Sequence, residues 1–223
     1  MISQAKLRNK EELAEILNPL VKEWFFSRFK DFSLTQLYGA MPIHERKSIL
    51  ISAPTGGTKT LTAFLSILNY LVSLAEKKEL ENKIYAVYVS PLKALNNDIA
   101  HNLIEPLKEI TEIAEKKGIK LQEIRVAVRT GDTTASERAK QARKVPHILV
   151  TTPESLAILL STKKFVDNLK ALEFAVIDEI HALACNKRGV HLSLSIEHLA
   201  AISNISFARI GLSATISPLD EIA

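Results

Sequence analysis

Six short runs of apolar and β-branched residues constrain the fold of this chain most, because a polar cluster and then a helix-length segment follow almost every one. This alternation predicts an α/β fold with a parallel sheet that is covered by helices on both faces. In such sheets, ligands bind beyond the carboxyl ends of the strands. We therefore expect the polar clusters to share one edge of a sheet whose strands are residues 49–52, 84–89, 124–128, 147–150, 174–177 and 207–212.

The first strand leads into a loop that suits phosphate binding. Residues 49–60 read Ile-Leu-Ile-Ser-Ala-Pro-Thr-Gly-Gly-Thr-Lys-Thr and precede an amphipathic helix. In a phosphate-binding loop, backbone N–H groups surround phosphate oxygens, a lysine reaches the β and γ phosphates, and a hydroxyl binds Mg²⁺. Lys59 and Thr60 fit the last two roles. The sequence therefore predicts ATP and Mg²⁺ as cofactors, bound at Thr55, Gly56, Gly57, Thr58, Lys59 and Thr60.

The fifth strand delivers two adjacent carboxylates to the same edge, since residues 174–181 read Phe-Ala-Val-Ile-Asp-Glu-Ile-His. Asp178 would hold Mg²⁺, directly or through water, while Glu179 would orient and deprotonate the attacking water. Two acids after a strand also occur in ordinary solvated turns. The phosphate loop on the same sheet edge favours the catalytic interpretation, with Lys59, Asp178 and Glu179 as catalytic residues.

Composition limits the class of protein only loosely. The 223 residues, of which 47% are hydrophobic, can bury a sizeable core, and the net charge of +4 permits an anionic partner without requiring one. The single cysteine, Cys185, excludes an intrachain disulfide and favours a reducing compartment. The charged N-terminus is unlike a secretory signal, and the apolar stretch 61–75 is shorter than the roughly 20 residues that span a bilayer. We therefore expect a cytoplasmic protein without a membrane partner.

The order and content of these motifs resemble the first motor domain of a superfamily 2 helicase, which is a RecA-like P-loop NTPase domain. In that family a glutamine upstream of the phosphate loop reads adenine, and Gln36 stands at the matching place. An amide offers a donor and an acceptor to the adenine edge, although a glutamine on an exposed helix face is the structural alternative. Residues 1–47, which are expected to be helical over about 10–29, would then form a lead-in that belongs to the same domain as the ATP-binding residues 48–223.

Three further clusters resemble motifs that contact one nucleic-acid strand. Their hydroxyls, loop or helix-start N–H groups and cations suit the phosphate backbone. They lack aromatic residues for base stacking, which predicts sequence-tolerant binding. The third cluster could equally be a plain helix start with proline in the first turn, and both interpretations can hold together. The predicted nucleic-acid-binding residues are Pro91, Leu92, Lys93, Arg129, Thr130, Gly131, Thr152, Pro153 and Glu154.

The last strand ends in Ser-Ala-Thr, which resembles the helicase motif that couples the nucleotide site to strand binding. The resemblance implies coupling roles for Ser213, Thr215 and His181. The tetrad ending in Ile-His and the stretch 181–199 resemble the large helicase-related (Lhr) branch. This resemblance covers nearly the whole chain and implies an ATP-dependent translocase on single-stranded DNA, with a role in DNA repair or recombination. Lys187 and Arg188 could touch DNA, but two cations on an exposed turn are more often solvated.

Two features depart from the family pattern. Thr58 stands where the family has a glycine, and a β-branched residue there would be costly if the position required positive φ. We expect ATP binding to be retained, and to be weaker only if that strain is present. The motifs of the second RecA-like domain, with its arginine fingers, are absent from these residues. We therefore expect the chain alone to lack ATPase and unwinding activity and to need that domain in cis or in trans.

Three other functions fit part of the pattern. A non-catalytic nucleic-acid or partner-binding module derived from a helicase domain would explain the altered loop. A restriction-enzyme translocase shares the same motor. A small-molecule kinase is disfavoured, because the five other motifs would then need separate explanations.

Overall fold

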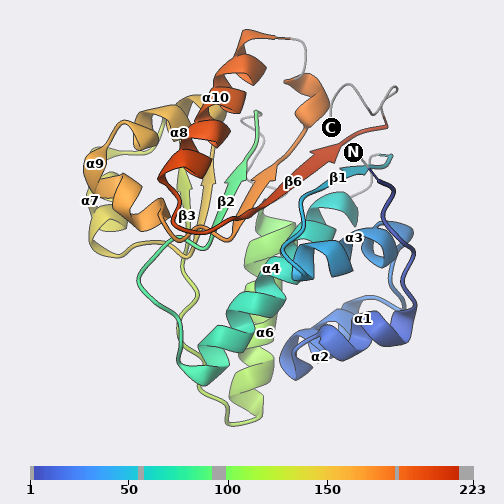
Figure 1. Cartoon of the computed structure of the whole chain (residues 1–223). Coiled ribbons are helices and arrows are strands. Elements are labelled where there is room, and N and C mark those ends of the chain that lie inside the picture. The colour runs from blue at the N-terminus through green and yellow to red at the C-terminus, as the bar shows by residue number, and fades with distance from the viewer. Residues whose placement is uncertain (1–2, 55–57, 92–98, 184–185, 216–223) are drawn as a thin grey trace.

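The computed structural model describes residues 3–54, 58–91, 99–183 and 186–215, which form a parallel sheet between two layers of helices (Figure 1). All neighbouring strands are parallel, in the order β1-β6-β5-β2-β4-β3. The predicted α/β fold and all six predicted strands are confirmed, with ends that shift by no more than two residues. The strands are β1 (Ile49–Ser52), β2 (Ala86–Val89), β3 (Val126–Arg129), β4 (Ile148–Thr151), β5 (Phe174–Ile177) and β6 (Ala208–Ser213).

The central strands explain the continuous apolar runs in the sequence. Every residue of β2, β4 and β5 is buried, because helices cover both faces of the sheet there. The edge strands β1 and β3 are only partly buried. Central strands therefore lack the alternation of polar and apolar residues that a one-sided sheet would show.

The two helical layers bury separate hydrophobic cores on opposite faces of the sheet. One layer contains α1 (Lys10–Ile16), α2 (Pro19–Arg28), α3 (Leu34–His44), α4 (Thr58–Lys77), a π-helical turn (Ala100–Ile104) and α6 (Glu105–Lys116). The other contains α8 (Pro153–Leu160), α9 (Lys163–Val166), two 3₁₀ turns (Asp167–Leu169, Ile180–Ala182) and α10 (Lys187–Ile202). Helix α7 (Ala135–Arg143) buries no residue and lies beside this second layer (Figure 1).

The lead-in consists of two helices, α1 and α2, where the sequence pattern predicts helix over about 10–29. Pro19 fits the first turn of a helix, where no N–H is needed, and the Asn18 side chain accepts the Leu20 N–H at 2.9 Å as its cap. Trp24 and Phe25 in α2 are fully buried in the core shared with α4 and the sheet. The lead-in is therefore packed as part of the sheet's own first layer.

Helix α4 has 20 residues and is long and apolar enough to cross a membrane by length and composition alone. The stretch 61–75 is part of this longer helix, so the length of the stretch alone does not decide against a membrane span. However, 72% of its most apolar window is buried inside the fold. This burial is what a core helix beneath a parallel sheet requires, and one such helix is weak evidence of a membrane span.

His147, just before β4, is buried. We expect its burial to make the free energy of unfolding depend on pH. Its Nδ1 accepts the Arg125 N–H at 3.1 Å, so the ring proton lies on Nε2, which has no partner among the described residues. Burial, and then the Arg125 charge, lower the pKa of His147 from 6.5 to about 4. As the pH falls, the imidazole takes up a second ring proton near pH 6.5 in the unfolded chain but only near pH 4 in the folded one. Acid therefore favours the unfolded chain, and stability that is present above pH 6.5 is lost as the pH falls toward 4.

We expect His147 to contribute up to about 3 kcal/mol to this loss, since each pKa unit corresponds to about 1.4 kcal/mol. Urea unfolding at pH 7.5 and at pH 4.5 would measure it, by comparing the wild type with His147→Asn, whose side-chain oxygen can still accept the Arg125 N–H. The variant should lose less stability than the wild type between these two pH values. Equal losses in both proteins would show that His147 is not the group responsible.

Candidate functional site

The order of the strands divides the predicted polar clusters into two groups at the carboxyl edge of the sheet. Strand β6 lies between β1 and β5, so the ends of the three strands that precede the phosphate loop, carry the Ser-Ala-Thr cluster and precede the acid pair are neighbours. Strand β4 lies between β2 and β3, so the three clusters that resemble strand-binding motifs are also neighbours. We call these groups the β1-β6-β5 half and the β2-β4-β3 half of the edge.

Lys59 lies in the first turn of α4 and is almost fully buried, with 7% of its surface exposed. Its Nζ donates to the carbonyl oxygens of Ala53, at 2.8 Å, and Pro54, at 3.1 Å. The ammonium group is thus held against the chain that leads from β1 into the loop. Thr60 follows in the same helical turn, and the predicted residues Thr55, Gly56 and Gly57 lie outside the described residues.

Thr58 is the first residue of α4 and does not have positive φ. Its carbonyl oxygen accepts the Thr62 hydroxyl at 2.6 Å, within the helix. The backbone strain that a β-branched residue would suffer in a left-handed conformation is therefore absent at this position. The main physical reason to expect weakened nucleotide binding is removed.

Asp178 directly follows β5 and is buried, with 6% of its surface exposed. Its N–H donates to the Val89 carbonyl at 2.8 Å, which continues the ladder between β5 and β2. Its carboxylate accepts the Glu179 N–H at 2.8 Å and is hydrogen-bonded to the Tyr88 hydroxyl of β2. These contacts fix a carboxylate at the sheet edge, as the sequence predicts.

Glu179 adopts a left-handed backbone conformation, with φ 50° and ψ 42°. Its carboxylate Oε2 lies 3.1 Å from Nε2 of His181. A non-glycine residue in this region costs roughly 1–2 kcal/mol, and such strain persists where the surrounding structure imposes it. The acid pair is thus presented by a strained turn.

We expect the free energy of unfolding of Glu179→Gly to exceed that of Glu179→Ala by roughly 1 kcal/mol, because glycine adopts positive φ without a Cβ penalty. Both variants remove the same carboxylate, so their difference isolates the backbone term. Chemical denaturation of the two variants in parallel measures it. A more stable alanine variant would contradict the strain at this position.

His181 joins the acid pair to the end of β6. Its Nδ1 accepts the Ala214 N–H at 3.2 Å and lies 3.2 Å from the Ser213 hydroxyl, so the proton of the neutral ring lies on Nε2, facing Glu179. Ser213 is fully buried, and its carbonyl accepts the Ala53 N–H at 3.3 Å. A continuous set of hydrogen bonds therefore connects β1, β6 and the turn after β5. Thr215 is exposed beyond this network.

Gln36 lies at the start of α3 and is buried, with 2% of its surface exposed. The alternative of an amide on an exposed helix face is therefore wrong. Its Oε1 accepts the Ser33 N–H at 2.8 Å, and the Ser33 side chain accepts the Gln36 N–H, which together form a capping box. The spacing Ser-x-x-Gln carried this signal in the sequence. No described residue accepts from Nε2 of Gln36, so its N–H₂ group is not used within the described part of the chain.

In the β2-β4-β3 half, the turn after β3 is held by hydrogen bonds from its own loop and from α7. Arg129 donates to Gln141 at 3.2 Å, the Thr130 N–H donates to the Thr133 hydroxyl at 2.8 Å, and the Gly131 carbonyl accepts from Arg138 at 3.1 Å. The turn therefore has a defined conformation. Burial, and then the nearby Arg138 charge, lower the pKa of Arg129.

Thr152 caps α8, since its hydroxyl accepts the Ser155 N–H at 3.3 Å, and Pro153 occupies the first turn. The predicted helix start is confirmed, and it places backbone N–H groups at the sheet edge. Pro91, after β2, is buried, whereas Leu92 and Lys93 lie outside the described residues. Arg188 is bonded to both segments: to Glu154 from Nε at 2.6 Å, and to the Pro91 carbonyl at 3.0 Å. Arg188 is exposed, as expected for a cation on a turn, but it is also paired with two other segments.

A family profile described as DEAD/DEAH box helicase matches residues 34–222. The chain belongs to this helicase family. It is 57% identical to the ATP-dependent helicase Lhr-Core of Methanocaldococcus jannaschii over 213 aligned residues. The alignment covers 96% of this chain and 25% of that protein. It is 40% identical to the Lhr helicase/uracil glycosylase of Escherichia coli, over 95% of this chain and 14% of that protein. The predicted membership of the Lhr branch is confirmed.

Among solved structures, the Mycobacterium smegmatis helicase Lhr bound to single-stranded DNA and AMP-PNP is similar to this chain. The TM-score is 0.84 with 39% identity, over 93% of this chain and 26% of that one. The DEAD-box helicase Mss116, at 20% identity and a TM-score of 0.77, shares the fold. This helicase chain therefore has the RecA-like motor fold and spans about a quarter of the length of the archaeal Lhr-Core relatives that it matches.

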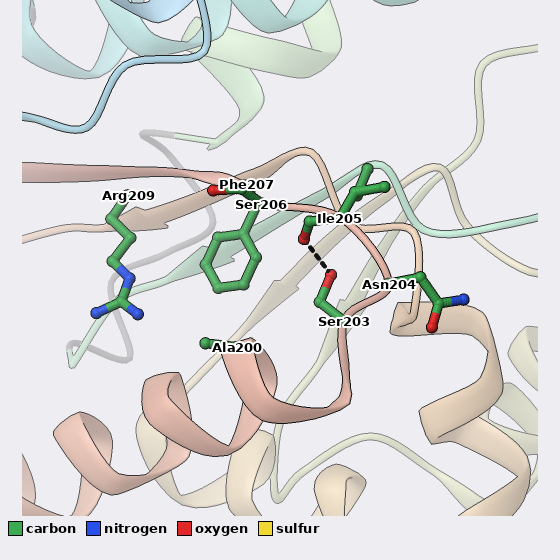
Figure 2. Close-up of a pocket in the computed structure, with 7 residues that line it drawn as sticks. All are labelled: Ala200, Ser203, Asn204, Ile205, Ser206, Phe207 and Arg209. Carbon is green, nitrogen blue, oxygen red and sulfur yellow. Dashed lines mark hydrogen bonds between the residues drawn. The ribbon is translucent and has the colours of Figure 1, made fainter.

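A cavity of about 340 Å³ in the helicase fold lies away from the predicted site, between the end of α10 and the start of β6 (Figure 2). Its lining includes Phe207, Arg209 and Ser203, whose hydroxyl donates to the Ile205 carbonyl at 2.8 Å. Arg209 is already paired with Glu197 at 2.6 Å. The cavity opens at the amino end of β6, whereas the helicase motifs lie at the carboxyl end.

Proposed function

We propose that this chain is the ATP-binding half of a DNA helicase motor of the Lhr type, in which residues 1–47 and 48–223 form one domain. The observation that carries the proposal is the hydrogen-bonded connection from β1 through Ser213 and Ala214 to His181 and Glu179. It joins Ala53, whose carbonyl accepts from Lys59, to the acid pair within the β1-β6-β5 half. Relatives that cover nearly the whole chain are named ATP-dependent helicases.

The described residues fit ATP with Mg²⁺. A buried carboxylate and a hydroxyl oxygen, from Asp178 and Thr60, are ligands that Mg²⁺ prefers, and Lys59 supplies a cation for the phosphates. The metal, when bound, neutralises charge that develops on the phosphates. Glu179 takes the proton of the attacking water, and His181 holds its carboxylate. Gln36 presents its N–H₂ group to adenine, and Thr55, Gly56, Gly57 and Thr58 complete the phosphate loop.

The β2-β4-β3 half binds the backbone of single-stranded DNA in this proposal. The capped start of α8 and the rigid turn of Arg129, Thr130 and Gly131 offer N–H groups and a cation to phosphates. The sequence assigns Pro91, Leu92 and Lys93 to the same strand-binding function, and Pro91 is the described member of the three. Ser213, Thr215 and His181 couple strand binding to the nucleotide. The solved relative bound to single-stranded DNA and AMP-PNP supports both ligands. Such a protein would act in the cytoplasm, in DNA repair or recombination.

A second RecA-like domain, in cis or in trans, completes the motor. In related phosphoryl-transfer enzymes an arginine supplied to the phosphates is worth roughly 10³ to 10⁵ in rate. The test is ATP hydrolysis, with and without single-stranded DNA, by this chain alone and by an assembly that adds the second domain. We expect negligible hydrolysis by the chain alone and DNA-stimulated hydrolysis by the assembly. An assembly without hydrolysis would instead support a non-catalytic binding module.

A further inference from the structure

Arg188 connects three elements at the carboxyl edge of the sheet. It lies in the first turn of α10, the helix that follows the acid pair. Its guanidinium forms a fork with the Glu154 carboxylate, with Nε–Oε1 at 2.6 Å and Nη2–Oε2 at 3.3 Å. Nη2 also donates to the Pro91 carbonyl at 3.0 Å. One side chain therefore joins α10 to the segments after β2 and β4.

The backbone that carries Arg188 is itself fixed. The Asn186 side chain accepts the N–H groups of Arg188, at 2.9 Å, and Gly189, at 3.1 Å. A Cβ added at Gly189 would lie 1.9 Å from the Leu183 carbonyl oxygen, so only glycine permits this close approach. The guanidinium is thus presented from a rigid turn, a condition for holding other segments in place.

The fork changes what Glu154 can do. Its carboxylate is paired with Arg188, and this pairing lowers the pKa of Glu154. A negatively charged Glu154 would repel a phosphate, so this side chain does not bind one. The phosphate-binding groups of the segment are then the N–H groups at the start of α8. The charge of Arg188 is neutralised by the same pair, so it is poorly suited to bind a phosphate itself.

We propose that Arg188 is a positioning residue that holds the Pro91 segment and the start of α8 in the spacing that a nucleic-acid strand requires. This inference rests on the proposed function of the β2-β4-β3 half. Because α10 follows the acid pair along the chain, the same fork links the element after the nucleotide site to the strand-binding path. Both side chains are about half exposed, so removing the pair leaves the fold intact.

The test is a double-mutant cycle on this chain with Arg188→Gln, Glu154→Gln and the double variant. Binding of a fluorescein-labelled oligothymidylate is measured by anisotropy at several salt concentrations. We expect each single variant to bind roughly tenfold more weakly and the double variant no more weakly than either, as for side chains that act as one unit. The slope of log affinity against log salt should stay that of the wild type, because no phosphate contact is lost.

Two further variants separate the fork from the charge. Arg188→Lys keeps the charge but not the planar fork, so it should be as weak as Arg188→Gln. Lys187→Gln removes the adjacent exposed cation and should bind nearly as the wild type does. If Arg188 contacts DNA directly, Glu154→Gln would bind as tightly as the wild type or more tightly, and Arg188→Gln would reduce the salt slope by about one. Either result would overturn the proposal.

Amide hydrogen exchange keeps this inference separate from the proposed function. Both Arg188→Gln and Glu154→Gln should accelerate exchange at Ser155 and Leu156, in the first turn of α8, without lowering the melting temperature. A wild-type chain that does not bind the oligonucleotide would refute the proposed function, while faster exchange would still support the fork. Unchanged exchange in both variants would overturn the positioning role whatever the DNA result.

Discussion

Glu179→Gln is expected to lower ATP turnover by about 10²- to 10⁴-fold in an assembly of this chain with a second motor domain, which is the range for loss of a general base. Glutamine has the same size and keeps the left-handed turn, and its amide can still contact His181, so nucleotide binding should be retained. Phosphate release at saturating ATP and single-stranded DNA measures the effect.

Glu197→Gln is the matched control for this charge change, because Glu197 pairs with Arg209 beside the cavity at the amino end of β6. It should leave turnover within about twofold of the wild type, as for surface substitutions away from the site. If Glu179→Gln kept nearly full turnover, the general base would have to be another group, and the acid pair would lose its proposed division of roles.

Arg46→Ala is expected to destabilise the fold by roughly 2–4 kcal/mol, because it removes two cation–π contacts and a half-buried ion pair. The guanidinium carbon lies 4.1 Å from the centre of the Tyr70 ring and 4.2 Å from that of Phe174. Its Nε lies 2.9 Å from Glu173, which also accepts the Tyr70 hydroxyl at 2.6 Å. Without Arg46, this largely buried carboxylate would keep, among the described residues, only the Tyr70 hydroxyl as a side-chain partner.

Lys78→Ala is the matched control, since it removes one positive charge and places an alanine at a similar positive φ, 65° against 62° at Arg46. Lys78 is exposed, so its loss should change the free energy of unfolding by about 0.5 kcal/mol or less. Urea denaturation of both variants at pH 7 compares them. Equal effects would show that the contacts of Arg46 contribute little beyond the shared backbone conformation.

The fold could be predicted from the sequence because its central strands are continuous apolar runs followed by polar clusters. The break between α1 and α2 was missed by the expectation of one helical stretch over 10–29, although Asn18 and Pro19 together signal a new helix. The order of the strands was not readable, because it depends on packing between distant segments. It is this order that places β6 between the phosphate loop and the acid pair.

The candidate site was predicted as separate motifs, whereas its connections needed the structure. The sequence pointed to His181 only through a family resemblance, whereas in the structure both ring nitrogens have partners. Arg188 was missed as a connecting residue, since its partners lie 34 and 97 positions away along the chain. Contacts of this range leave no local pattern. Thr58 does not meet the condition of positive φ under which strain was expected, whereas Glu179 has a left-handed conformation that the sequence did not indicate.

The most direct test of the account is calorimetric titration of this chain with ATP and Mg²⁺, beside Lys59→Ala and the charge-matched control Lys78→Ala. We predict one ATP bound per wild-type chain, the same affinity in Lys78→Ala, and binding about 10- to 100-fold weaker in Lys59→Ala, since a charge-assisted hydrogen bond is worth roughly 1.5–3 kcal/mol. A wild-type chain that binds no ATP, or a Lys59→Ala variant that binds it equally well, would contradict the proposed nucleotide site.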